Sequence, residues 1–201
     1  AKAGWVRVER RPTSAGLATR TSAELELEVF GAARTFRALA ISEVDRRLEL
    51  QRLSVELDSD LLRVEAEGHM VERGLELAVR IAGVEQRMVV PVTAPAASDS
   101  LAARVLATRP EPGERFAIEV FAPFGLAPRT VDVEYLGRAT VIALDGRLPA
   151  HRLRTVVEGL PLDAWVDGSG EVLRQELPFG LVIVRETEAE AISQEAAGGG
   201  P

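Results

Sequence analysis

The feature that most constrains the fold is an alternation of apolar and polar residues along almost the whole chain. In the stretch AELELEV, Leu25, Leu27 and Val29 fall on one side of an extended chain and the glutamates between them fall on the other. The same period of two recurs at residues 53–57, 75–81, 116–120, 131–135 and 153–157. Such alternation indicates antiparallel strands with one buried and one solvated face.

The spacing of the turns indicates how these strands connect. Candidate strands follow one another about every 10 to 14 residues, separated by Gly, Pro, Asp or Ser. Short hairpins between sequential neighbours are the simplest connection for such a series. We therefore expect a mainly β fold, built as a single strongly curved antiparallel meander sheet, an open half-barrel.

One strand changes the phase of its alternation. Leu48 and Leu50 occupy even positions, whereas the apolar residues of 53–57 occupy odd positions. An extra residue between the two runs would turn both sets of side chains toward the same face. We predict a β-bulge or a sharp bend near Gln51 and Arg52.

A helix interrupts the β pattern in the middle of the chain. The run SDSLAARVLATRP offers Ser98 or Asp99 as an N-cap, then an apolar stripe, and ends at Pro110. These signals predict one short helix near 99–109.

The end of the chain departs from the β pattern as well. The acidic, alanine-containing stretch from about Glu188 predicts a short C-terminal helix. The glycines after it predict a flexible tail or linker at 195–201. We expect residues 1–194 to form a single β domain.

The stretch DAWVDGSGEVLRQEL places one of only two tryptophans, Trp165, just before a turn. Its Asp-Gly-Ser-Gly segment tolerates positive φ angles, which predicts a four-residue hairpin loop between two strands. A tryptophan beside such a turn commonly packs across the strand pair. Packing and stacking on a ligand both remain open for Trp165.

The composition excludes several classes of function. The 201 residues include no cysteine, which excludes thiol nucleophiles, disulfides and cysteine-ligated metal centres. The net charge of -7, without a block of Lys or Arg, argues against a nucleic-acid partner. No run reaches the roughly 18 to 20 apolar residues that a membrane-spanning helix needs.

The residues that could carry catalysis form no known pattern. His69 and His151 lie in strand-like sequence, and no G-x-S-x-G motif accompanies them, so each is interpreted as an exposed or hydrogen-bonded histidine on a strand. The glutamates at 24–28 share one strand face, which favours a solvated surface over acid–base chemistry. The acidic residues at 163–171 lack the D-x-D-x-D-G pattern of a calcium loop. We predict no catalytic, cofactor-binding or metal-binding residues and no cofactor.

Four motifs in the second half of the chain carry a family resemblance. They are a Pro-Gly-Glu turn at 112–114, a V-x-V-x-Y-x-G strand at 131–137, an A-W-V-D-x-x-G-x-V-L-R hairpin at 164–174 and an R-E-T-E-x-E-A ending. Their order resembles the bacterial extracytoplasmic β domains found N-terminal to transglutaminase-like, papain-like domains. More distantly, it resembles periplasmic half-barrel proteins of unknown function with the lipoprotein-carrier fold.

The resemblance implies a non-catalytic, extracytoplasmic accessory or binding domain. It would be a scaffold or recognition module for a protein partner, or for an adjacent transglutaminase-like domain. Because a transglutaminase-like centre needs a cysteine, any such activity would lie outside this chain. A periplasmic or other extracytoplasmic location follows from the same resemblance, and no signal peptide is visible in the chain.

The resemblance also leaves an alternative function. The domain would then be a carrier that binds a lipid or acyl chain in the concave face of the half-barrel. The candidate groove residues are Leu25, Leu27, Leu75, Leu77, Leu101, Val105, Phe116, Ile118 and Trp165. An ordinary close-packed core accounts for the same residues, so both interpretations stay open.

Overall fold

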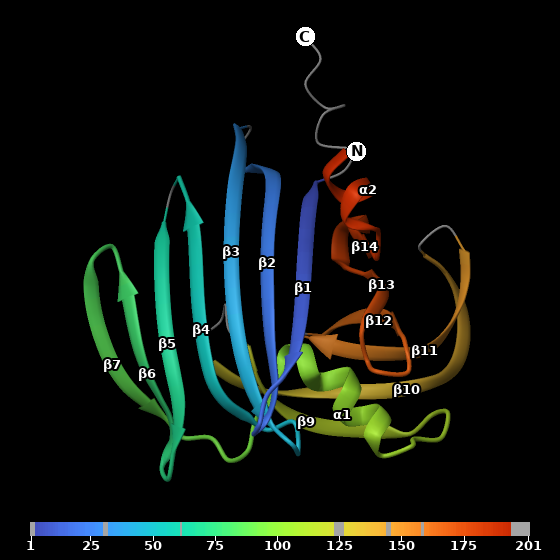
Figure 1. The fold of residues 1–201 in the computed structure, drawn as a ribbon, viewed down its shortest axis with the longest axis horizontal. Coiled ribbons are helices and arrows are strands. Elements are labelled where there is room, and N and C mark those ends of the chain that lie inside the picture. The colour runs from blue at the N-terminus through green and yellow to red at the C-terminus, as the bar shows by residue number, and fades with distance from the viewer. Residues whose placement is uncertain are drawn as a thin grey trace. The chain divides into compact units, whose positions relative to one another are not determined.

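The computed structural model describes residues 3–29, 32–60, 62–122, 127–143, 146–157 and 159–193. Within these ranges the protein is mainly β, with two sheets of seven strands each and a few short helices (Figure 1). In both sheets, strands that follow one another in the sequence lie next to one another. The expected meander is therefore confirmed.

The first sheet has the strand order β1 to β7, and its strands are β1 (Gly4–Pro12), β2 (Gly16–Val29), β3 (Ala32–Asp45), β4 (Leu50–Ser59), β5 (Arg63–Val71), β6 (Gly74–Ile81) and β7 (Val84–Val90). The second sheet runs from β14 back to β8, and its strands are β8 (Ala96–Ala97), β9 (Arg115–Ala122), β10 (Ala127–Ala143), β11 (Gly146–Val157), β12 (Leu160–Val166), β13 (Val172–Glu176) and β14 (Val182–Val184).

The prediction of one continuous half-barrel sheet is wrong, because β7 and β8 belong to different sheets. The segment between them contains Pro91 and Pro95. A proline has no N–H to donate to a strand ladder, so this segment is poorly suited to continue the ladder of the first sheet. Period-two alternation identifies strands but does not tell which strands share a sheet.

The chain divides into two compact units. The first comprises residues 1–98 and 121–128, and the second comprises residues 99–120 and 129–201. The expectation that residues 1–194 form a single domain stays a prediction, since a compact unit need not fold independently.

The core of the first unit lies on one face of its sheet. Leu53 and Val55 on β4 and Leu75, Leu77 and Val79 on β6 alternate inward and are buried in one cluster. Other parts of the same unit complete this cluster: Val44, Leu50, Ala66, Val92, Ala97 and Phe121. The sheet is thus amphipathic, as the alternation predicted.

The predicted β-bulge in β4 is confirmed. Arg52 pairs with Glu43, and Leu50 pairs with Val44, which leaves Gln51 as the extra residue. Both Leu50 and Leu53 are buried, although they occupy positions of opposite parity. The bulge therefore keeps the two apolar runs of this strand on the same face.

Both predicted helices are present. The middle helix consists of a 3-10 turn, η1 (Ser98–Ser100), followed by α1 (Leu101–Ala107), within the expected range. The N-cap of α1 is Ser100, the last residue of the 3-10 turn, rather than Ser98 or Asp99. A second 3-10 turn, η2 (Pro178–Gly180), precedes β14.

The C-terminal helix, α2 (Glu188–Ser193), begins at the residue predicted from the sequence. Thr187 and Glu190 form a capping box, in which the Glu190 carboxylate accepts the Thr187 N–H at 2.9 Å. The predicted tail at 195–201 lies outside the described residues.

Candidate functional site

One apolar residue from each strand of the first sheet falls on a single line across the apolar face. The strand register joins them in the order Val6, Ala23, Ala38, Leu57, Val64, Ile81 and Val84. None of these seven residues is buried, and the exposed fractions of Val6, Ile81 and Val84 are 41%, 45% and 62%. We call this line the apolar row.

The apolar row borders the buried core of the first unit. In the adjacent row, Val55, Ala66 and Val79 are buried. On its other side, Leu25 pairs with Phe36, and both side chains are half-buried. The apolar face of the sheet therefore extends past the core into residues that remain partly accessible.

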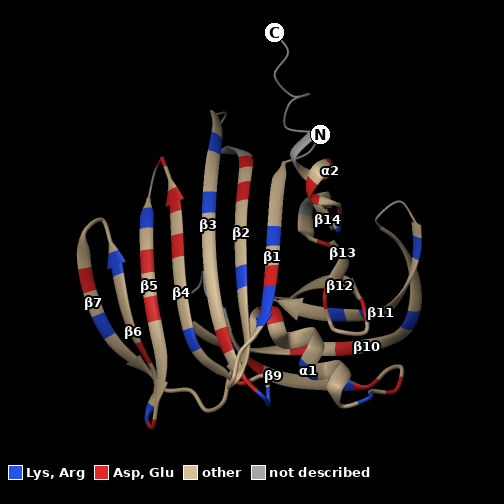
Figure 2. Cartoon of the chain, viewed as in Figure 1, with Lys and Arg blue, Asp and Glu red and all other residues tan. Residues whose placement is uncertain are grey.

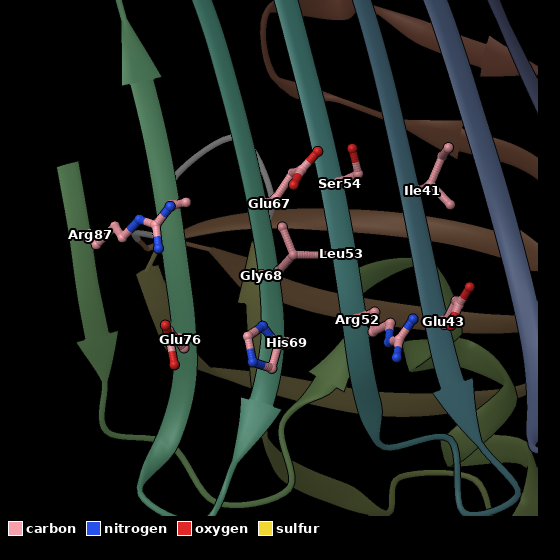
Figure 3. A pocket seen from close by; sticks show the side chains of 11 residues that line it. Ile41, Glu43, Arg52, Leu53, Ser54, Glu67, Gly68, His69, Glu76 and Arg87 are labelled. Atoms are coloured by element: carbon pink, nitrogen blue, oxygen red, sulfur yellow. The ribbon is translucent and has the colours of Figure 1, made fainter. Parts of the chain in front are cut away.

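The opposite face of the same sheet carries an open depression with a volume of about 560 Å³ (Figure 3). Strands β3 to β7 contribute its lining, and the titratable side chains in it are Glu43, Arg52, Glu67, His69, Glu76 and Arg87. The register places Glu43, Arg52, His69 and Glu76 side by side on four successive strands. These groups can donate and accept hydrogen bonds to a polar molecule.

Charges on this face pair with one another outside the depression. Figure 2 shows acidic and basic positions on neighbouring strands of the sheet. Arg37 binds Glu24 at 3.0 Å, and Arg80 bridges Glu65 and Glu85 at 3.0 Å and 2.9 Å. The solvated position expected for the glutamates at 24–28 is confirmed for the exposed Glu26, whereas Glu24 is half-buried and bound to Arg37.

The structure places the predicted groove residues in both units. In the first unit, Leu75 and Leu77 have no exposed area and belong to the close-packed core, whereas Leu25 is half-buried on the same face. The side chain of Leu27 lies outside the described part of the chain. Leu75 and Leu77 are therefore close-packed core residues, the simpler of the two interpretations.

The remaining groove residues lie in the second unit. On α1, Val105 is fully buried and Leu101 is half-buried. Phe116 and Ile118 are half-buried on β9, and Trp165 is half-buried on β12. One groove lined by all nine residues stays a prediction. The apolar row was missed because only the strand register reveals which residues share it.

Trp165 packs within its own sheet. It lies against a cluster in the second unit formed by Val141, Ala143, Ala150 and Leu173. The guanidinium carbons of Arg152 and Arg174, on the two neighbouring strands, lie 5.0 Å and 6.0 Å from its ring centroid. Packing across the strand pair is thus observed, with cation–π contacts on both sides.

The hairpin beside Trp165 has residues 167–171 between its strands, one residue more than the predicted four-residue loop. Asp167 N–H donates to the Glu171 carbonyl at 2.9 Å across the base of this loop. Gly170 N–H donates to the Asp167 carbonyl at 3.0 Å, and Gly170 has a φ of 85°. A β-turn followed by a left-handed glycine is a standard hairpin ending.

Asp163 is the buried charge of this sheet. It is 9% exposed, and the Arg154 guanidinium donates to both of its carboxylate oxygens, at 2.7 Å and 3.0 Å. Arg152 donates to it as well. The Arg154 hydrogen bonds, reinforced by Arg152, hold the pKa of Asp163 below its ordinary value although burial raises it.

This lowered pKa gives a pH-dependent prediction for Asp163→Asn. A carboxylate with a depressed pKa stabilises the folded state above its unfolded pKa of about 3.9, and this contribution is lost as the pH falls through the folded value. We expect the substitution to lower the free energy of unfolding by about 1–2 kcal/mol at neutral pH, since both arginines are partly exposed. Urea unfolding at neutral pH and below about pH 3.5 measures the difference, which should shrink in acid.

Glu176→Gln is the matched control for this prediction. Glu176 pairs with Asp163 across the strands, but its side chain is 48% exposed and binds only Arg174 among the described residues. Glu176→Gln should therefore change the free energy of unfolding little at either pH. A loss for Asp163→Asn that stays constant between neutral and acid pH would contradict the charge-based account.

Both histidines lie where the strand interpretation placed them. His69 is exposed on β5. A hydrogen bond of 2.8 Å joins His151 Nδ1 to the hydroxyl of the buried Tyr135. Across the described residues, no three His, Cys, Asp or Glu side chains are grouped to hold a metal ion. In the same ranges, no helix has the length and hydropathy to cross a membrane.

Two of the motifs behind the family resemblance meet in the second unit. Gly113 N–H donates to the Tyr135 carbonyl at 2.7 Å, and Tyr135 N–H donates to the Glu114 carbonyl at 2.9 Å. A Cβ on Gly137, which has a φ of 103°, would lie 3.3 Å from the Pro112 ring. The Pro-Gly-Glu turn and the V-x-V-x-Y-x-G strand are therefore parts of one backbone pairing.

These observations define a mainly β protein with two seven-stranded sheets and, among its described residues, no group of His, Cys, Asp or Glu that could hold a metal ion. No protein family model and no curated protein matches the chain. Among solved structures, it is similar to a DUF1089 family protein from Pseudomonas aeruginosa, with a TM-score of 0.55, 15% identity and coverage of 92% of this chain and 93% of that one.

A second similar structure is a beta-barrel-like protein of domain of unknown function DUF1849 from Brucella abortus. Its TM-score is 0.61 at 8% identity, with 89% of this chain and 83% of that chain covered. At such identities the likeness shows the fold alone. It supports the resemblance to barrel-like proteins of unknown function, and no comparison links the chain to transglutaminase-like domains.

Proposed function

We propose that this protein is a non-catalytic binding domain that holds the apolar part of a lipid or acyl-bearing ligand along the apolar row. The observation that carries the proposal is the row itself. Seven apolar residues on seven successive strands are only half-buried or exposed, beside a core that is fully packed. Contiguous exposed apolar surface on a folded protein marks an interaction site.

The dimensions of the apolar row suit an extended hydrocarbon chain. Six strand spacings of about 4.8 Å give it a length of roughly 29 Å. The apolar face is open beside it at Leu25 and Phe36, whereas Leu75 and Leu77 are too deeply buried to touch a ligand. The proposal therefore moves the acyl-chain site of the sequence analysis from the core leucines to the apolar row.

Native mass spectrometry of the purified protein, followed by organic extraction, tests the proposal. We expect a bound acyl-bearing molecule, or saturable binding of palmitic acid or a diacyl phospholipid added to the stripped protein. Val6→Asn changes the exposed residue at one end of the apolar row, and Ile81→Asn changes an exposed residue one strand from the other end. Together they should weaken binding about tenfold or more, because burying such a side chain contributes about 1.5–3 kcal/mol.

Val89→Asn is the matched control for Val6→Asn. Val89 is also 41% exposed, but it lies on the opposite face of the sheet, and its substitution should leave binding unchanged. The absence of any bound lipid together with no uptake of either probe would refute the proposal. Equal weakening by Val89→Asn would refute the apolar row as the site.

A second candidate function is the recognition module expected from the sequence, which binds a protein partner. Exposed apolar residues on edge strands favour it, notably Val84, Met88 and Val89 on β7. The association with a transglutaminase-like partner and the extracytoplasmic location remain proposals that rest on the sequence resemblance.

A further inference from the structure

Strand β7 is an open edge of the first sheet. It is the last strand in the order and, among the described residues, pairs only with β6 (Figure 1). Six of its seven residues are exposed, and the seventh, Val90, is half-buried. Its outer backbone N–H and C=O groups can therefore pair with another strand.

The opposite edge strand, β1, is protected against such pairing. It carries Arg7, Glu9 and Arg11, ends at Pro12, and has Arg10 on its apolar face. Inward-facing charges and prolines are devices by which natural edge strands avoid association. Strand β7 has neither an internal proline nor a register shift against β6.

The sequence of β7 is complementary to itself. VEQRM, residues 84–88, reads apolar, acidic, polar, basic, apolar around Gln86. We propose that β7 pairs antiparallel with β7 of a second copy of this chain, about a two-fold axis that passes between their Gln86 residues. This inference does not depend on the ligand proposed above.

The proposed register places complementary side chains opposite one another on both faces of the sheet. On the charged face, Glu85 lies opposite Arg87 of the second copy, and the pair is repeated by the two-fold symmetry. On the apolar face, Val84 lies opposite Met88 of the second copy. Because a two-fold axis perpendicular to the sheet keeps each face on its own side, the two sheets join without exchanging apolar and charged surfaces.

The charges also select this register over its neighbours. A pairing centred on Arg87 would place two arginines opposite each other, and one centred on Glu85 would oppose two glutamates. Opposite charges directly across a strand pair contribute about 0.2–1 kcal/mol each, and like charges oppose pairing. One strand pair buries less than the roughly 1,600 Å² of a standard interface, so we expect a weak, concentration-dependent dimer.

Charge-reversed variants test the proposal by sedimentation velocity across a wide concentration range. Arg87→Glu gives a chain with acidic residues at both 85 and 87, and Glu85→Arg gives a chain with basic residues at both. Each variant alone should dimerise at least about tenfold more weakly than the natural chain, and an equimolar mixture of the two should restore dimers.

Matched controls repeat each charge change on the same face away from the edge. Arg63→Glu on β5 and Glu56→Arg on β4 alter exposed residues and should leave dimerisation unchanged. Circular dichroism confirms that each variant is folded. A monomeric natural chain at all concentrations, or a mixture that fails to restore dimers, would overturn the proposal.

A cysteine cross-link reads the register directly, because the natural chain contains no cysteine. Gln86→Cys should form an intermolecular disulfide under mild oxidation, since residues directly opposite have Cβ atoms about 4.5–5.5 Å apart. Val90→Cys, on the same face of the strand, would lie roughly 27 Å from its counterpart and should not cross-link. Cross-linking at 90 but not at 86 would overturn the proposed register.

Discussion

Replacing Leu77 with alanine is expected to lower the free energy of unfolding by about 3 kcal/mol. Leu77 lies on β6 with no exposed area, and it belongs to the core cluster of the first unit. The packed strands around it cannot collapse fully into the space that the substitution leaves. Urea or thermal unfolding followed by circular dichroism measures the loss.

Gly68, which pairs with Leu77 on the neighbouring strand, provides a sharper form of this test. A Cβ at position 68 would lie 2.6 Å from Leu77 Cδ2 and 3.3 Å from Leu53 Cγ. Gly68→Ala alone should therefore destabilise the protein by about 1–3 kcal/mol through overpacking. In the double variant with Leu77→Ala, the methyl group added at position 68 occupies part of the space that the leucine side chain leaves.

We expect the double variant to be at least about 1 kcal/mol more stable than the sum of the single effects predicts. Val44→Ala serves as the control, because Val44 lies in the same core two strands away from Gly68. Its effect should add to that of Gly68→Ala. Strict additivity for the Gly68 and Leu77 pair would contradict the contact between them.

The second large effect is expected for Gly170→Ala, which should cost about 3 kcal/mol. Gly170 has a φ of 85°, and a Cβ there would lie 2.5 Å from the backbone nitrogen of Ala103 and 2.7 Å from its Cα. Both residues belong to the second unit, where the hairpin turn meets α1. Because the obstacle is backbone, the helix or the turn must move.

Gly159→Ala separates backbone strain from this clash. Gly159 has a φ of 79° but nothing within 4 Å of its Cβ position. The Gly159→Ala variant should lose only the roughly 1–2 kcal/mol of stability that a left-handed conformation costs an alanine. The melting temperatures of the two variants give the comparison, and equal losses would show that Gly170 has no steric role.

Much of the fold could be predicted from local patterns. The strands, the bulge at Gln51, the helix after Ser98, the start of α2 and the hairpin after Trp165 all follow from residues adjacent in the chain. The hairpin loop was predicted one residue too short, because strand pairing ends at Val166 and Val172. Turn residues indicate that a chain reverses, but the last ladder bond depends on both strands.

The candidate site could be predicted only in its chemical character. Alternation identified an apolar face that includes Leu25, Leu75 and Leu77, but it could not separate core from accessible surface. Leu77 is fully buried, whereas Ile81, on the same face of the same strand, is 45% exposed. Which residues other segments cover is a property of the packed unit.

Asp163 shows the same difference between what the sequence indicates and what the packed structure decides. The sequence identified it only as one of the acidic residues at 163–171, and the register of β11 against β12 brings Arg152 and Arg154 to its carboxylate. Periodicity along the chain determined the strands and their amphipathic faces, and the composition excluded cysteine chemistry. The division of the strands into two sheets, the apolar row and the ion pairs of the buried Asp163 were decided by tertiary structure, because each depends on pairing between strands that no single segment specifies.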